Sequence, residues 1–166
     1  MRKQQVVIIG SSSDSGHMEE AYQIGRRIAE MGCVLISGGR GGIMKAASRG
    51  AMENGGITVG ILPSGDMDEA NEFCGIVIPT GIGYARNSMN ILSGDIIIAM
   101  EGGAGTLTEL AYAWQYGKTV ICCTFCGGWS RIFAEIGPDQ RAGSRLLAAA
   151  SLEQVYEHLD ALISAR

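Results

Sequence analysis

The chain has 166 residues, of which 46% are hydrophobic and 18% charged, and its formal net charge is −4. This length suits one domain over 1–166, because single domains most often hold about 100–150 residues. The hydrophobic share excludes an intrinsically disordered chain. The acidic balance argues against a nucleic-acid partner, whose binding surface normally carries a basic patch.

The opening stretch MRKQQVVIIGSSS holds only four successive apolar residues, fewer than the ~7–15 of a secretory signal. No apolar run approaches the ~18–20 residues of a membrane span. The five cysteines are an odd number, which favours reduced thiols. We therefore expect a cytoplasmic protein with no membrane partner.

Short apolar runs alternate with helical patterns along the chain. We expect strands over 5–10, 33–37, 57–62, 75–80, 95–100 and 119–125, with a seventh candidate at 145–150. We expect helices over 16–31, 42–54, 85–93, 104–117, 128–136 and 152–165. The runs are continuously apolar, as is typical of parallel strands covered on both faces. This alternation predicts an α/β fold: a Rossmann-like, doubly wound parallel sheet of about six to seven strands with helices on both faces.

Two glycine-rich segments follow expected strands and precede expected helices. Ser37–Lys45 and Glu101–Glu109 both contain GGxG, and a third strand end reads Gly10-Ser-Ser-Ser13. Free N–H groups at a helix start attract anions, and glycine lets oxygen atoms approach the main chain. Ligands of such sheets bind beyond the carboxyl ends of the strands, so the three segments together predict a phosphate site. One GGxG alone would fit a close strand–helix packing turn equally well.

Glu109 and Arg86 each have a structural and a functional interpretation. Thr106 and Glu109 fit a capping box with Thr106 as the N-cap. Alternatively, the Glu109 carboxylate faces the ligand and stabilises an oxocarbenium-like charge, as in cleavage of an N-glycosidic bond. Arg86 forms either a surface ion pair or, together with Arg40, a grip on phosphate oxygens.

The remaining motifs favour structural roles. Cys123 and Cys126 form a CxxC at the end of an expected strand, which could be redox-active or metal-binding, but buried structural cysteines are the favoured interpretation. Ser151 and Gln154 predict a capping box at the start of the last helix. The polar, acidic segment 63–74 predicts a mobile surface loop and not a metal site.

The segments GGRGGIMKAASRGA, ARNSMN and GGAGTLTEL, in this order, resemble the lonely-guy type phosphoribohydrolases, long classed as lysine decarboxylases, and their relatives the molybdenum cofactor carrier proteins. The resemblance covers Gly10 to about Trp114. It implies a Rossmann-like fold and a homodimer. The hydrolases release a base from a nucleoside 5′-monophosphate and leave ribose 5-phosphate. Their signatures read PGG-x-GT-x-x-E and R-K-x-x-M.

The resemblance implies roles for particular residues. Arg86 and Glu109 match the catalytic pair, if the chain is a hydrolase, and Met89 fits the methionine of the second signature. Glu101 replaces the proline of the first signature and places an extra carboxylate at the mouth of the site, while Asn87 replaces the lysine of the second. Both changes reduce the positive charge, and the YARN version is closer to the carrier proteins, which bind their ligand without turnover.

We therefore expect a binding protein of the molybdenum cofactor carrier type, and keep a nucleoside 5′-monophosphate phosphoribohydrolase as the alternative. The expected partner is a phosphorylated small molecule, no cofactor or metal is required, and the molybdenum cofactor is a candidate cargo. The expected ligand-binding residues are Gly10, Ser11, Ser12, Gly38, Gly39, Arg40, Gly41, Gly42, Met44, Arg86, Asn87, Gly102, Gly103, Gly105 and Thr106.

Overall fold

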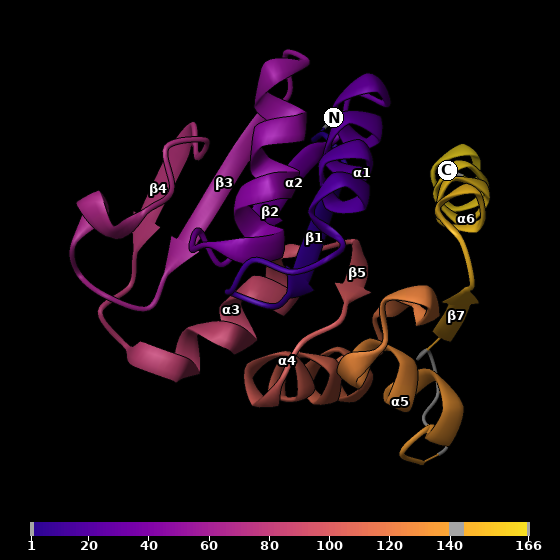
Figure 1. Ribbon diagram of the computed structural model, residues 1–166. Coiled ribbons are helices and arrows are strands. Elements are labelled where there is room, and N and C mark those ends of the chain that lie inside the picture. Colours follow the sequence, from indigo (N-terminus) through magenta and orange to yellow (C-terminus); the bar gives the residue numbers. More distant parts are fainter. Residues whose placement is uncertain (1, 140–144, 166) are drawn as a thin grey trace.

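Seven parallel strands form one sheet in the computed structural model, which describes residues 2–139 and 145–165 (Figure 1). The strands are β1 (Gln5–Gly10), β2 (Val34–Ser37), β3 (Ile57–Leu62), β4 (Ile76–Pro79), β5 (Ile96–Met100), β6 (Thr119–Cys123) and β7 (Arg145–Ala149). The helices are α1 (Met18–Glu30), α2 (Gly42–Glu53), α3 (Arg86–Ser93), α4 (Ala104–Gln115), α5 (Gly128–Ile136) and α6 (Leu152–Ser164). The predicted α/β class and the parallel sheet are confirmed.

The strand order is β4-β3-β2-β1-β5-β6-β7, so the chain builds outward from β1 in one direction and then in the other. The reversal lies between β1 and β5, where Gly10 pairs with Met100. At such a reversal the loops after two neighbouring strands leave toward opposite faces, which opens a crevice beyond the carboxyl ends. The fold therefore places the expected ligand site beside Gly10.

Two apolar layers cover the sheet, with α1, α2 and α6 on one face and α3, α4 and α5 on the other (Figure 1). Side chains of β1 alternate between these layers: Val6 and Ile8 pack with the first, and Val7 and Ile9 with the second. Successive residues of a strand point to opposite faces. A strand covered on both sides must therefore be apolar throughout, which explains the continuous run VVII.

Helix starts show one correct and one wrong prediction. The Gln154 N–H donates to Ser151 Oγ at 3.3 Å, so Ser151 caps the last helix as expected, while the Gln154 side chain accepts from the N–H of Ala150, one residue before the N-cap, at 2.8 Å. The expected N-cap at Thr106 is wrong, because α4 begins at Ala104 with Gly103 as N-cap. The glycines before it turn the chain early, with Gly102 at a φ of 92°. Thr106 and Glu109 therefore both lie inside the helix.

Strand β6 is shorter than expected. It ends at Cys123, and a single 3₁₀ turn over Thr124–Cys126 replaces the last two residues of the predicted strand 119–125. The apolar run continues through this turn because Cys126 is also buried. Of the described helices, none has the length and apolar character needed to cross a membrane.

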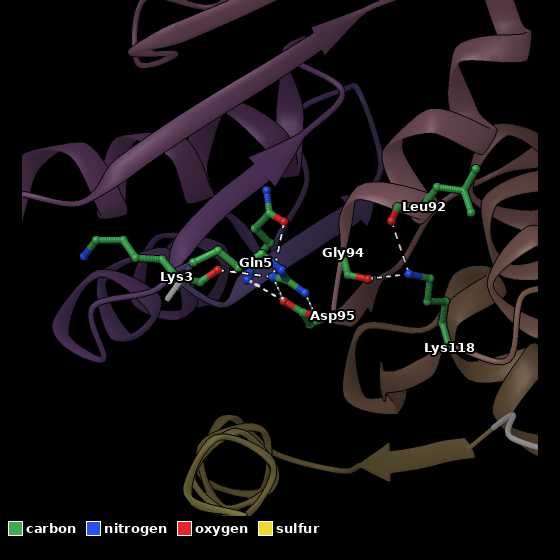
Figure 2. A network of polar contacts seen from close by, with 7 residues as sticks. Lys3, Gln5, Leu92, Gly94, Asp95 and Lys118 are labelled. Carbon is green, nitrogen blue, oxygen red and sulfur yellow. Dashed lines mark hydrogen bonds and ion pairs between the residues drawn. The ribbon is translucent and has the colours of Figure 1, made fainter. Parts of the chain in front are cut away.

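A polar network joins the starts of the three adjacent strands β1, β5 and β6 (Figure 2). The Asp95 carboxylate accepts two hydrogen bonds from Arg2, at 2.7 and 2.6 Å, and one from the Gln5 N–H at 3.0 Å. The Lys118 Nζ donates to the carbonyls of Gly94 at 2.6 Å and Leu92 at 3.2 Å. These contacts connect the starts of β1, β5 and β6 with the end of α3.

Close packing of α1 on α2 predicts a sharp response to one methyl group. A Cβ on Gly25 would lie 2.0 Å from the Ala47 carbonyl oxygen. Gly25→Ala should lower the free energy of unfolding by about 1–3 kcal/mol, because two backbones must move apart, although alanine favours a helix by ~1 kcal/mol. Urea denaturation measures this change. Gly16→Ala, where a Cβ meets no atom within 4 Å, is the control, and equal stability of the two variants would contradict the close contact.

Candidate functional site

A cleft of about 730 Å³ opens at the carboxyl ends of the central strands. The loops after β1, β2 and β5 all contribute to it, so the three predicted segments meet at one rim of the sheet. The predicted residues in its wall are Gly10, Ser11, Ser12, Arg40, Gly41, Met44, Arg86, Asn87, Gly103, Gly105, Thr106 and Glu109. Pro63, Gly83, Tyr84 and Ala104 line it as well.

The two GGxG segments have different structural roles. In the β2–α2 loop, a Cβ on Gly42 would lie 2.3 Å from the Ser11 carbonyl oxygen, and that carbonyl accepts the Ile43 N–H at 2.9 Å. In the β5–α4 loop, a Cβ on Gly103 or Gly105 would meet no atom within 4 Å. The first segment is thus a close packing turn, and the second leaves the start of α4 open to the cleft.

Four predicted site residues do not line the cleft. A Cβ on Gly39 would lie 2.9 Å from the side chain of Leu62, and one on Gly102 would lie 2.0 Å from the Thr106 Oγ1. Gly38 and Gly42 also face other parts of the chain. The sequence could not separate these glycines from the open ones, because a packing turn and a ligand turn have the same spacing.

Arg86 is a buried cation in the wall of the cleft. It is the first residue of α3 and is only 8% exposed. A Cβ on Gly38 would lie 2.1 Å from Arg86 Nη1, so the guanidinium rests directly against the main chain after β2. Burial lowers the pKa of Arg86, the Glu109 charge raises it, and the Arg40 charge lowers it further. Its Nε is buried without a hydrogen-bond partner in the described part of the chain.

Glu109 lies one turn into α4 and lines the same cleft. Its Oε1 accepts a hydrogen bond from Asn90 Nδ2 at 3.0 Å, and the residue is 7% exposed. Burial raises the pKa of Glu109 to about 7, against smaller lowering effects of the Asn90 hydrogen bond and the Arg86 charge. A carboxyl group that titrates near neutral pH is suited to general acid–base chemistry.

Arg40 is already paired within the chain. Its guanidinium forms an ion pair with Glu69, and the Asn71 side chain donates to the Arg40 carbonyl at 2.9 Å. The segment 63–74 therefore attaches to the β2–α2 loop through its acidic side chains, with a second ion pair between Lys45 and Glu72 at 3.0 Å. The described residues contain no group of three or more His, Cys, Asp or Glu that could hold a metal ion.

Glu101 lies beside the cleft but outside its wall. Its Oε1 is 3.9 Å from the Nε2 of His17, and Gly128 packs on its backbone. Its φ is 53°, the one positive value at a non-glycine position among the described residues. Proline is restricted to a φ near −65°, so the proline of the hydrolase signature does not fit this backbone. The expected extra carboxylate at the cleft mouth turns toward α1 instead.

Asn90 was missed by the motif comparison. Counted from Arg86, the fifth position of R-K-x-x-M is Asn90, so the assignment of Met89 to the methionine was wrong by one residue. Met89 is 40% exposed, whereas Asn90 is completely buried. A polar residue on the inner face of a short helix, one turn after Arg86, was the available signal.

The cysteine motif has no exposed thiol for redox chemistry. The side chains of Cys123 and Cys126 are both buried, and their hydrogen bond, with burial, raises the pKa of Cys123. Burial raises the pKa of Cys122 to about 12. Thiol reactivity needs an accessible thiolate, so this cluster serves the core.

The burial of Glu109 predicts that the free energy of unfolding depends on pH. Its carboxyl pKa is raised from 4.5 to about 7, so below pH 4.5 the cost of ionisation is absent and above pH 7 it is complete. Stability contributed by this group is therefore lost as the pH rises over that interval. Glu109→Gln should gain in free energy of unfolding relative to the parent protein between pH 5 and pH 8. Urea denaturation at several pH values measures this, and a difference that stays constant with pH would contradict it.

Two proteins are similar to this chain in sequence. An uncharacterised protein of Archaeoglobus fulgidus is 43% identical over 121 residues, which cover 72% of this chain and 80% of that protein. A probable cytokinin riboside 5′-monophosphate phosphoribohydrolase of Oryza sativa subsp. japonica is 34% identical over 109 residues, which cover 63% of this chain and 44% of that protein. The match therefore spans less than half of the rice enzyme.

Solved structures agree with the fold over nearly the whole chain. A molybdenum cofactor binding protein of Rippkaea orientalis has a TM-score of 0.84 and 36% identity, with 98% of this chain and 99% of that chain covered. The molybdenum cofactor carrier protein of Chlamydomonas reinhardtii has a TM-score of 0.84 and 28% identity, with the same coverage. The family model of SLOG cluster4 matches residues 3–156. The chain therefore belongs to the SLOG cluster4 family, in the lonely-guy-like group that includes the molybdenum cofactor carriers.

Proposed function

We propose that the chain binds a phosphorylated, nucleotide-like ligand in the cleft between β1, β2 and α4, as a carrier of the molybdenum cofactor type. The observation that carries this proposal is the pairing of a buried cation with an open helix start. Arg86 is held against the backbone at Gly38, and Gly103 and Gly105 leave the first amides of α4 uncovered. Within residues 2–139 and 145–165, no side chain caps this helix start.

The electrostatics of the cleft favour an anion with a polar body. A helix start carries about half a positive charge. A guanidinium that rests against the main chain has little rotational freedom and is therefore pre-organised to bind phosphate oxygens. Ser11, Ser12 and Thr106 line the same wall. The molybdenum cofactor is a phosphorylated pterin, and a cleft of about 730 Å³ is within the usual size for a small-molecule site.

The carrier interpretation is supported by the two structural relatives, a molybdenum cofactor binding protein and a molybdenum cofactor carrier protein, which match this chain nearly end to end. Asn87, where the hydrolase signature has a lysine, removes one cation that a nucleotide phosphate would use. The described part of the cleft accordingly offers Arg86 and the backbone of α4 as the main anion contacts.

Hydrolysis is the second candidate, and one specific observation favours it: Glu109 is buried in the cleft wall with a pKa of about 7. In this case a nucleoside 5′-monophosphate and water would give the free base and ribose 5-phosphate. Glu109 would stabilise the oxocarbenium-like charge or take a proton from the attacking water, and Arg86 would hold the phosphate.

Removal of the buried cation should weaken ligand binding. Arg86→Met retains a long, unbranched side chain but removes the charge. We expect at least about a tenfold loss in affinity for AMP, because charge-assisted hydrogen bonds are each worth about 1.5–3 kcal/mol. Isothermal titration calorimetry with AMP, and with the molybdenum cofactor released from a donor protein, measures this loss.

Two variants control this experiment. Arg131→Met removes an exposed arginine of α5, which is paired with Glu135 outside the cleft, and should leave the affinity unchanged. Gly105→Ala should stabilise α4 by up to ~1 kcal/mol yet weaken binding, because its methyl group enters the open space at the helix start. Full affinity in Arg86→Met and Gly105→Ala would contradict the proposed binding mode.

Turnover separates the two candidates. If the chain is a carrier, incubation of the pure protein with AMP should release no adenine above the uncatalysed background, as measured by liquid chromatography. Adenine that appears with the parent protein and is lost in Glu109→Gln would replace the carrier function by hydrolysis. Adenine that persists in Glu109→Gln would instead indicate a contaminating enzyme.

A further inference from the structure

Asn90 connects α3 to the carboxylate of Glu109 in the cleft wall. It lies one turn after Arg86 on the inner face of α3 and is completely buried. Its Nδ2 donates to Glu109 Oε1 at 3.0 Å. Both ends of α3 are fixed, since Arg86 rests against Gly38 and Lys118 binds the carbonyls of Leu92 and Gly94. The amide therefore stands at a defined place relative to the carboxylate.

The contact leaves one atom of each group uncommitted. The Oδ1 of Asn90 is buried with no hydrogen-bond partner in the described part of the chain. A buried polar atom without a partner is costly, so this amide is not placed for the stability of α3 alone. On the Glu109 side, Oε1 accepts the Asn90 hydrogen bond, no hydrogen bond from another described residue reaches Oε2, and the residue lines the cleft. An amide also has a donor at one side and an acceptor at the other, so it can pair with either a carboxylate or, after rotation, a carboxylic acid.

We propose that Asn90 is the positioning residue for Glu109: its amide holds Oε1 against α3 and leaves Oε2 as the oxygen that faces the bound ligand. This inference rests on the proposed function, because it names the carboxyl oxygen that the ligand meets. It applies to carriage and to hydrolysis alike.

The charged surroundings of Glu109 are simple. Arg86 of α3 acts on it directly, and Arg40 of the β2–α2 loop acts on Arg86. The end of β1 contributes Gly10, Ser11 and Ser12, which carry no charge. Burial opposes the carboxylate, and the Asn90 hydrogen bond and Arg86 support it. Loss of the amide donor should therefore shift the balance toward the protonated form.

The test is the titration of Glu109 in the ligand-free protein. The ¹³C signal of its carboxyl group, assigned by its absence in Glu109→Gln, should titrate with a midpoint near pH 7 in the parent protein. In Asn90→Leu, which keeps the volume but removes the donor, the midpoint should rise by about one pH unit or more. Ser93→Ala, whose hydroxyl donates to the Met89 carbonyl on the exposed side of α3, should leave it unchanged.

A second variant covers the case in which Asn90→Leu does not fold. Asn90→Asp has the same shape but places a second carboxyl group beside the first, so the pair should retain one proton to higher pH. If the Glu109 midpoint stays at the parent value in whichever variant folds, Asn90 is only a packing residue and the inference is overturned.

The affinity for AMP, measured at several pH values, distinguishes a failure of this inference from a failure of the proposed function. Affinity for AMP should fall as Glu109 ionises, because a carboxylate opposes an anion, and in Asn90→Leu that fall should move to higher pH together with the titration midpoint. The phosphate's own ionisation near pH ~6 is common to every variant. If the parent protein does not bind AMP at any pH, the ligand class is wrong, while the carboxyl titration still decides the role of Asn90.

Discussion

The pairing of β1 with β5 is the constraint on which the site depends. Because the strand order reverses between them, the loop after β1 leaves toward α1 and the loop after β5 toward α4, on opposite faces of the sheet. The crevice between these loops receives Gly10 from one side and Gly103 from the other. Any fold that placed β5 elsewhere would separate the open start of α4 from the β2 end that supports Arg86.

Burial determines the chemistry of the cleft. Few charged groups line it, and the exclusion of water strengthens the electrostatic interactions of each. Arg86 and Glu109 have opposite charges and mutually supporting effects on each other's ionisation. Removal of water penalises both charges, and it raises the pKa of Glu109 to about 7, where the carboxyl group is close to the balance between its ionised and neutral forms. A group in that condition responds to a ligand's charge more readily than an exposed carboxylate would.

Much of the fold and part of the site followed from local sequence patterns. Runs such as VVII predicted strands because a strand covered on both faces must be apolar on both, and the order of the three motifs predicted the family. The cap at Thr106 was wrong because three glycines let the helix begin earlier than its hydroxyl residues suggest. The position of Asn90 one turn after Arg86 could be found from the helix period, but its hydrogen bond to Glu109 and the pairing of Arg40 with Glu69 join distant segments, and no spacing in a single sequence reveals such contacts.

The unusual backbone at Glu101 limits how this protein can change over evolutionary time. A φ of 53° is open to few residues and closed to proline. A lineage cannot pass between this loop and a proline-bearing one by a single exchange, because the intermediate would break the contacts of residue 101 with Ser130 and Gly128. Glycine tolerates both kinds of backbone, so it is the replacement that keeps the φ of 53° at position 101 without strain.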